Sequence, residues 1–369
     1  ALSDRQTIQD EVDQLLTEID RVSETTKFNE TYLLKGDKDT KTVTVDAHDA
    51  GIEGSLTQNT TKATFTMDKL SLGDTIKIGG TEYTIGASKA DVIASIANLS
   101  SGELITIDGT QYTVSATADK NEDKNILDQA GIEAKIAEGS SVVYKGNTLK
   151  VMTTDATGAG FTGATQTASQ VDYQDPKVIS AKKAYDLIQQ ELGLASSVGA
   201  TNTSATVTAG KAVTVGTAEK VQFEIKKGTV DRKEGLTFAL HVGADADMTN
   251  KISVQIDALD TAGLGIKGLN VKDSSGAAAT YAIDAIADAV SHVSSQRSLL
   301  GAVQNRLEHT INNLDNVVEN TTAAESQIRD TDMATEMVKY SNANILSQAG
   351  QSMLAQGNQS NQGVLSLIG

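Results

Sequence analysis

The chain has 369 residues and a mass of 38.6 kDa, which is enough for two or three domains with hydrophobic cores of their own. Its formal net charge of −17 at pH 7 would repel phosphate groups, so neither nucleic acid nor a membrane is expected as a partner. No cysteine is present, which excludes disulfides, thiolate metal ligands and cysteine nucleophiles. There is no run of about eighteen apolar residues and no signal-peptide pattern, so we expect any export to use another route.

The first forty residues predict one amphipathic helix and the turn after it. Its apolar residues alternate four- and three-residue steps, with charged and polar residues between them, which is the spacing of a heptad seam. The residues of this seam are Ile8, Val12, Leu15, Ile19 and Val22. A helix of this kind needs an apolar partner.

Residues 41–237 have a different composition, rich in Thr, Val, Gly and Asp, and this composition predicts an α+β insertion. Segments 75–85, 104–114 and 142–151 each place glycine in a tight turn between alternating apolar residues, as in a β-hairpin. In the second of them, Asp108-Gly109 suits the positive φ angles of a two-residue turn.

Short helices are predicted after these hairpins. Ser88 and Asp91 form a capping box before one apolar-periodic stretch, and Asn121 precedes a second. Hairpin and helix together make an internal repeat. Asp175 followed by Pro176 predicts the start of a further helix, because a capping residue stands before proline at the first helical position.

A long helix is predicted towards the carboxyl end of the chain. One row of its apolar residues recurs every seven positions, and a companion row is interrupted by Arg297 and Gln304. The simplest partner for this seam is the amino-terminal helix, so the two ends of the chain should meet. A much shorter helix cannot cover all of it, and part of the seam is left for another partner. The first row is Ile286, Val293, Leu300, Leu307 and Leu314, and the companion row is Ile283, Val290, Ile311 and Val318.

The last thirty residues, Tyr340 to Gly369, contain no Asp, Glu, Lys or Arg, although 21% of the chain is charged. An end that lay in water would tolerate charge, so its absence indicates a segment enclosed by protein. The apolar residues recur at helical spacing and predict an assembly element. The predicted interface residues are Ile345, Leu346, Ala349, Met353, Leu354, Val364, Leu365, Leu367 and Ile368.

No chemistry of catalysis or cofactor binding is found in the sequence. The four histidines lie far apart, without the His-Glu-x-x-His spacing that holds zinc. Asp245, Asp247 and Asn250 resemble part of a calcium loop, but the required glycine and terminal glutamate are missing. We therefore predict no catalytic residue, no metal site and no cofactor, and a protein that is not an enzyme.

Several segments closely resemble bacterial flagellin, in the same order along the chain. The carboxyl-terminal likeness covers 299–307, 325–336, 345–350, 353–356 and 364–368, and the amino-terminal one covers 8–12, 18–23 and 26–29. Residues 241–247, 252–254 and 264–266 resemble the β-hairpin segment that packs on the family's helices.

The resemblance implies an α+β fold in which long, coiled-coil-like helices from the two chain ends pack together with a β-hairpin segment. Residues 1–40 would be the amino-terminal helix and turn of a helical body, and residues 41–237 a variable outer insertion of β-hairpins and short helices. Residues 238–324 would complete the helical body with the hairpin and a long helix. Residues 325–369 would be an inner-tube helix packed against copies of itself.

It also implies a structural subunit of the flagellar filament, which polymerises for swimming motility and is extracellular without a cleaved signal peptide. The implied partners are other flagellin subunits, an export chaperone and the type III apparatus, and the filament cap and junction proteins. Toll-like receptor 5 is a further implied partner, with Gln9 and Glu11 as the matching contact residues.

The chain departs from the family pattern at its start, since flagellins normally begin with roughly a hundred further residues that pair with the tail. We expect those residues to be missing here, and the segment after about Arg329 to be disordered or self-associated. Two alternatives remain open, a flagellin-like surface adhesin and a hook-filament junction protein. An enzyme within the insertion is disfavoured because the His-Glu-x-x-His of flagellin metallopeptidases is absent.

Overall fold

The computed structural model describes residues 2–37, 39–116, 121–153, 170–243, 250–272, 276–329 and 332–369. They form two compact units: unit one comprises Ala1–Phe238 and Gln255–Ser298, and unit two comprises Ala239–Val254 and Leu299–Gly369. Asp245 and Asp247, considered above as part of a calcium loop, lie outside the described residues, as does the side chain of Ile368.

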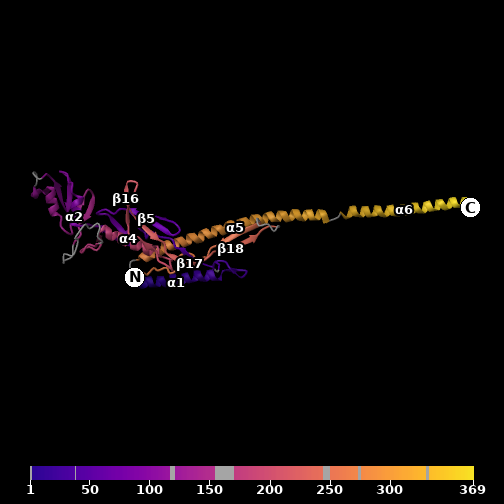
Figure 1. Ribbon diagram of the computed structural model, residues 1–369, viewed down its shortest axis with the longest axis horizontal. Helices are drawn as coiled ribbons and strands as arrows, with labels where there is room; N and C mark the ends of the chain where they lie inside the picture. The colour runs from indigo at the N-terminus through magenta and orange to yellow at the C-terminus, as the bar shows by residue number, and fades with distance from the viewer. Residues whose placement is uncertain are drawn as a thin grey trace. The chain divides into compact units, whose positions relative to one another are not determined.

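Unit one begins with helix α1 (Leu2–Thr25), drawn in indigo in Figure 1. A small hairpin follows, formed by β1 (Lys27–Phe28) and β2 (Thr31–Tyr32). Strand β3 (Thr40–Thr44) then pairs antiparallel with β17 (Thr229–Lys233), so the start and the end of the insertion lie side by side. Everything between these two strands belongs to the insertion.

The first lobe of the insertion is a five-stranded sheet packed on helix α4 (Ala181–Ala195). Phe65 and Phe223 lie opposite each other on its two central strands and are both fully buried. A three-stranded sheet, β13-β7-β6, shares the same core. The strands of this lobe are β4 (Ser55–Gln58), β5 (Lys62–Asp68), β6 (Thr75–Ile78), β7 (Thr81–Ile85), β13 (Val178–Ile179), β14 (Thr206–Val207), β15 (Lys211–Val215) and β16 (Ala218–Lys226).

The second lobe is a five-stranded sheet in the order β10-β9-β8-β11-β12, covered by two short helices. Side chains alternate along β8, so that Ile105 and Ile107 enter the core. The elements are β8 (Leu104–Ile107), β9 (Thr110–Val114), a 3-10 turn η2 (Glu122–Lys124), β10 (Ile126–Leu127), β11 (Ser141–Tyr144), β12 (Asn147–Lys150), and helices α2 (Lys89–Ser95) and α3 (Gln129–Lys135).

The rest of the chain forms a two-stranded sheet and two long helices. Strands β18 (Leu236–His241) and β19 (Lys251–Ile256) pair with each other. Helix α5 (Ala277–Arg329) has 53 residues and contributes to both units, whereas α6 (Met333–Ile368) has 36 residues and belongs to unit two. Residues 333–368 are helical, so the expectation of disorder after Arg329 is wrong for them, and self-association stays a prediction.

The three hairpins predicted from the sequence are confirmed as β6–β7, β8–β9 and β11–β12. The capping box is confirmed as well, because the Ser88 hydroxyl accepts a hydrogen bond from the Asp91 amide at 3.2 Å. The hairpin segment expected near residues 241–254 is present as β18–β19.

Two predicted helix starts are wrong. The helix expected after Asn121 begins instead with Asp128 as its cap, because Ile126 and Leu127 are taken up by a parallel strand pair with β9. The helix expected at Asp175-Pro176 begins with Ser180 as its cap, since the two residues before it form β13. In both places an apolar pair that fits a helix is used by a sheet.

Candidate assembly surface

Helix α1 joins an apolar cluster that it shares with the first part of α5 and the segment between β19 and α5. The α1 side of this contact consists of Val12, Leu16 and Ile19. The α5 side consists of small residues, Ala282, Ala285 and Ala289, and the intervening segment adds Ile266 and Leu269. Small side chains of α5 and larger ones of the other two segments thus form one cluster. The predicted meeting of the two ends of the chain therefore occurs within unit one.

Gln9 is a buried polar residue of α1, with 8% of its surface exposed. Its side-chain amide donates to the carbonyl of Leu269 at 2.9 Å and accepts from the amide of Val271 at 2.7 Å. The side chain thus extends the backbone pairing of the segment in the manner of a strand. Since both bonds are made inside the chain, Gln9 is a structural clamp, and its role as a receptor contact stays a prediction. Glu11, two positions on, is exposed.

Two further polar side chains hold the same region. The carboxylate of Asp20 accepts from the amide and the hydroxyl of Thr261, at 2.8 and 3.0 Å. Gln296 on α5 is buried and donates to the carbonyl of Gln255 at 3.0 Å. Sequence reasoning missed these clamps, although a glutamine standing between apolar positions of a seam was a usable signal.

The predicted seam of α1 divides into two rows, of which one is packed inside the chain and the other is exposed. Val12 and Ile19 pack on the apolar cluster shared with α5 and the segment before it, together with Leu16, which the prediction omitted. Ile8, Leu15 and Val22, which recur every seven residues, are exposed and do not belong to it. For these three residues the predicted intrachain contact is wrong.

The same division is found on α5. The predicted row of Val293, Leu300, Leu307 and Leu314 is half-buried. Its companion on the covered face is Ala289, Gln296, Val303 and Thr310, not the more apolar row predicted from the sequence. The exposed row is Ile283, Val290, Ile311 and Val318, and Ile286 beside it is exposed as well. The predicted companion row is therefore a surface of this chain.

Helix α6 starts at a strong local cap. The Asp332 carboxylate accepts from the hydroxyl and the amide of Thr335 at 2.9 and 3.2 Å, and from the amide of Ala334 at 3.0 Å. These bonds, chiefly those from Thr335, lower the pKa of Asp332 because they favour its charged form. A negative charge at the amino end of a helix also interacts favourably with the positive end of the helix dipole, so it stabilises α6.

Beyond its cap, α6 carries apolar side chains that no described residue covers. Leu346 is 73% exposed, and the other predicted interface residues whose side chains are described are also exposed. They are Ile345, Ala349, Met353, Leu354, Val364, Leu365 and Leu367. Exposed apolar surface of this extent marks an interaction site.

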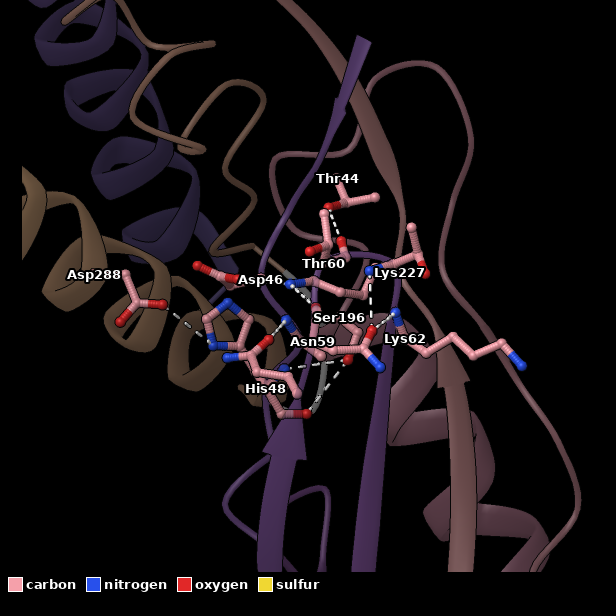
Figure 2. Close-up of polar contacts among 12 residues, drawn as sticks. Thr44, Asp46, His48, Asn59, Thr60, Lys62, Ser196, Lys227 and Asp288 are labelled. Atoms are coloured by element: carbon pink, nitrogen blue, oxygen red, sulfur yellow. Dashed lines mark hydrogen bonds and ion pairs between the residues drawn. The ribbon is translucent and has the colours of Figure 1, made fainter. Parts of the chain in front are cut away.

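A polar cluster lies at the base of the insertion, where β3 and β17 leave the helical part of unit one (Figure 2). The side chain of Lys227 is 5% exposed, and its ammonium pairs with Asp46 at 2.7 Å and reaches the carbonyl of Asn59 at 3.4 Å. The backbone amide of His48 donates to the hydroxyl of Ser196, the residue that caps α4, at 3.2 Å. These bonds tie the entry strand, the exit strand and α4 together.

The same cluster also approaches α5. His48 Nδ1 lies 4.0 Å from the carboxylate of Asp288. Burial raises the pKa of nearby Asp284, and His48 opposes that shift. Within the described ranges no group of three or more His, Asp or Glu could hold a metal ion. The described residues also include no helix that could cross a membrane.

Two family models match the chain at the elements that carry these surfaces. The bacterial flagellin amino-terminal helical region matches residues 1–39, and the bacterial flagellin carboxyl-terminal helical region matches residues 283–368. The first match begins at residue 1 and does not support the expectation that about a hundred residues of the family are missing before it.

Related proteins agree with this result. The chain is 32% identical over 394 residues to a flagellin of Salmonella rubislaw, covering 99% of this chain and 78% of that protein. It is 45% identical over 166 residues to a flagellin of Bacillus subtilis (strain 168), covering 40% of this chain and 53% of the relative. It is 42% identical over 134 residues to the flagellar filament 33 kDa core protein of Treponema phagedenis, covering 35% and 46%.

The fold, the exposed helical rows and these matches define a structural protein of the bacterial flagellar filament and not an enzyme. The chain belongs to the flagellin family. Flagellins assemble with other flagellin subunits into the extracellular filament, so the prediction of a filament subunit is confirmed.

Proposed function

We propose that this chain polymerises through the exposed apolar rows of α1, α5 and α6. The observation that carries the proposal is α6, whose residues from Tyr340 onward carry no Asp, Glu, Lys or Arg and whose described apolar side chains are all exposed. At about 1.5–3 kcal/mol for each large apolar side chain that is fully buried, even half of this surface would drive association. Ser, Asn and Gln on the rest of the helix can bond to neighbouring copies without the cost of burying charge.

The proposed division of labour follows the chain. Residues 1–40 and 238–324 build the helical body, with coiled-coil packing completed by neighbouring subunits. Residues 325–369 form the inner tube, and residues 41–237 project outward. The insertion is rich in Thr, whereas the helices carry apolar rows, and this difference in composition supports the assignment.

Further partners follow from the same function. An export chaperone and the type III apparatus would deliver the unfolded chain, and the absence of cysteine suits that route because no disulfide must form. Cap and junction proteins would bind the filament ends. For Toll-like receptor 5, Glu11 remains the proposed contact because its side chain is exposed.

The test is a charge placed in the proposed interface. Leu346→Glu should weaken self-association by at least about tenfold, since an unpaired carboxylate would have to enter an apolar contact. Gln111→Glu, at an exposed position of β9 outside the proposed interface, adds the same charge and serves as the matched control. Sedimentation velocity over a range of protein concentrations measures both variants against the parent chain.

The expected outcome is concentration-dependent association of the parent and of Gln111→Glu, with Leu346→Glu shifted towards monomer. A parent chain that stays monomeric at every concentration, or a Leu346→Glu variant that associates as well as the parent, would refute the proposal.

A further inference from the structure

The insertion contains three copies of one unit, a hairpin followed by a short parallel strand and a helix. In each copy the short strand immediately precedes the helix cap and adds to the second strand of a hairpin. The three strand positions are Ala87 before α2, β10 before α3, and β13 before α4. They pair in parallel with Val151 just after β12, with β9 and with β7, respectively.

Only the second copy is closed on itself, since β10 pairs with its own hairpin strand β9. The first and third copies exchange their parts. Hairpin β6–β7 of the first copy contributes to the core of the first lobe, while its helix α2 contributes to the core of the second. Hairpin β11–β12 of the third copy lies in the second lobe, while its strand β13 and helix α4 lie in the first.

Chain length explains the exchange. A strand needs a connection of about a dozen residues before it can return parallel to the strand it follows. Residues 115–125 supply this in the second copy. In the first copy only Gly86 separates Ile85 from Ala87, so Ala87 must pair with another hairpin. It takes the edge of β12, donating from its amide to the carbonyl of Lys150 at 3.1 Å.

The two exchanged segments pass each other at Gly86. The Gly86 amide donates to the carbonyl of Ile179 at 2.9 Å, within the first lobe's sheet. A Cβ atom at this position would stand 2.5 Å from Val178 Cγ1 and 2.8 Å from Met152 Cγ. Val178 belongs to β13 and Met152 follows β12. Gly86, which has no side chain, therefore lies where the two exchanged segments pass each other.

We propose that this exchange is an interlock that makes the two lobes open only together. Each lobe is completed by a piece of a unit whose other piece lies in the partner lobe, so neither can unfold while the other keeps its full set of strands. The consequence for an extracellular filament is resistance to proteolysis, because cleavage requires an opening that carries the free energy of both lobes.

The test is hydrogen exchange of the full chain under mildly denaturing conditions. Ile132→Ala removes a fully buried side chain from the second lobe alone, and such losses speed exchange through global opening by at least about thirtyfold. With the interlock, amides of α4 in the first lobe should lose protection by the same factor as those of β8. Gly193→Ala in α4 meets only Val207 at 3.7 Å and should raise protection in both lobes, because alanine favours a helix over glycine.

Gly301→Ala, in unit two with no atom within 4 Å of the added Cβ, is the control and should alter neither lobe. Gly86→Ala should speed exchange in both lobes by about tenfold or more, since Val178 and Met152 must move. The inference is overturned if the effect of Ile132→Ala stays within the second lobe. The Ile132 and Gly193 variants decide the matter even where Gly86→Ala does not fold.

Discussion

Replacing Gln9 by methionine tests the clamp between α1 and the segment before α5. Methionine keeps the length and much of the volume of glutamine but neither donates to Leu269 nor accepts from Val271. Each neutral hydrogen bond contributes about 1 kcal/mol net, and a buried group left unpaired adds about 1–3 kcal/mol. Two bonds lost in a buried site therefore predict about 2–4 kcal/mol of local destabilisation.

Local hydrogen exchange is the suitable assay, because a chain with two units need not unfold in a single step. The amide of Val271 donates directly to Gln9, so its exchange should accelerate by about thirtyfold for each 2 kcal/mol lost. Amides of the second lobe, whose core is a separate cluster, should keep their rates.

Glu11→Met is the matched control on the same helix. The side chain of Glu11 is exposed, so the change should alter stability by no more than about 0.5 kcal/mol. The reasoning fails if Val271 exchanges at the same rate in Gln9→Met as in the parent chain. It fails equally if Glu11→Met destabilises the segment as much as Gln9→Met does.

Three further predictions concern the insertion. Phe223→Ala should lower the stability of the insertion by about 3–5 kcal/mol in thermal or denaturant unfolding, because the fully buried ring, whose centroid lies 6.4 Å from that of Phe65, leaves a cavity when it is removed. Asp46→Asn should destabilise the base of the insertion more than Lys227→Met, measured by exchange of β3 amides, since it leaves a buried ammonium without its carboxylate. Hydrogen bonds from the Ser100 amide, the Tyr144 hydroxyl and Lys145 lower the pKa of Glu103 to about 2. Because this folded-state pKa lies below the unfolded one, the stabilisation is present above about pH 4.5 and is lost as the pH falls towards 2, and Glu103→Gln should remove that dependence from acid unfolding curves.

Features that depend on neighbours in sequence were predictable. The hairpin turn at Asp108-Gly109 has positive φ at both residues, as its residue types require. The capping box at Ser88 forms because donor and acceptor lie three residues apart in any helix that starts there. Neither feature needs information from elsewhere in the chain.

Features that depend on distant partners were not predictable. Val178 and Ile179 follow a good helix start at Asp175-Pro176, yet they pair with Thr84 and Ile85 nearly a hundred residues earlier. An apolar pair satisfies a helix face and a sheet edge equally well in the sequence. The sheet prevails because its partner strand β7 offers an open edge, and no local pattern records that edge.

The helical rows were predicted as apolar, but their partners were not. Both α1 and α5 carry two apolar rows, and periodicity alone favours the more apolar row of α5 for the contact within the chain. The structure instead buries the alanines of α5 in the cluster that it shares with α1 and with Ile266 and Leu269. Ile283 and Val290 are thereby left in water, together with Ile8 and Leu15 on α1. A chain that was stable only as a monomer would gain about 1 kcal/mol or more for each such residue by burying it internally. Because these rows are exposed, the free energy of burying them is gained only when another subunit covers them. The stability of the helices is thereby coupled to assembly.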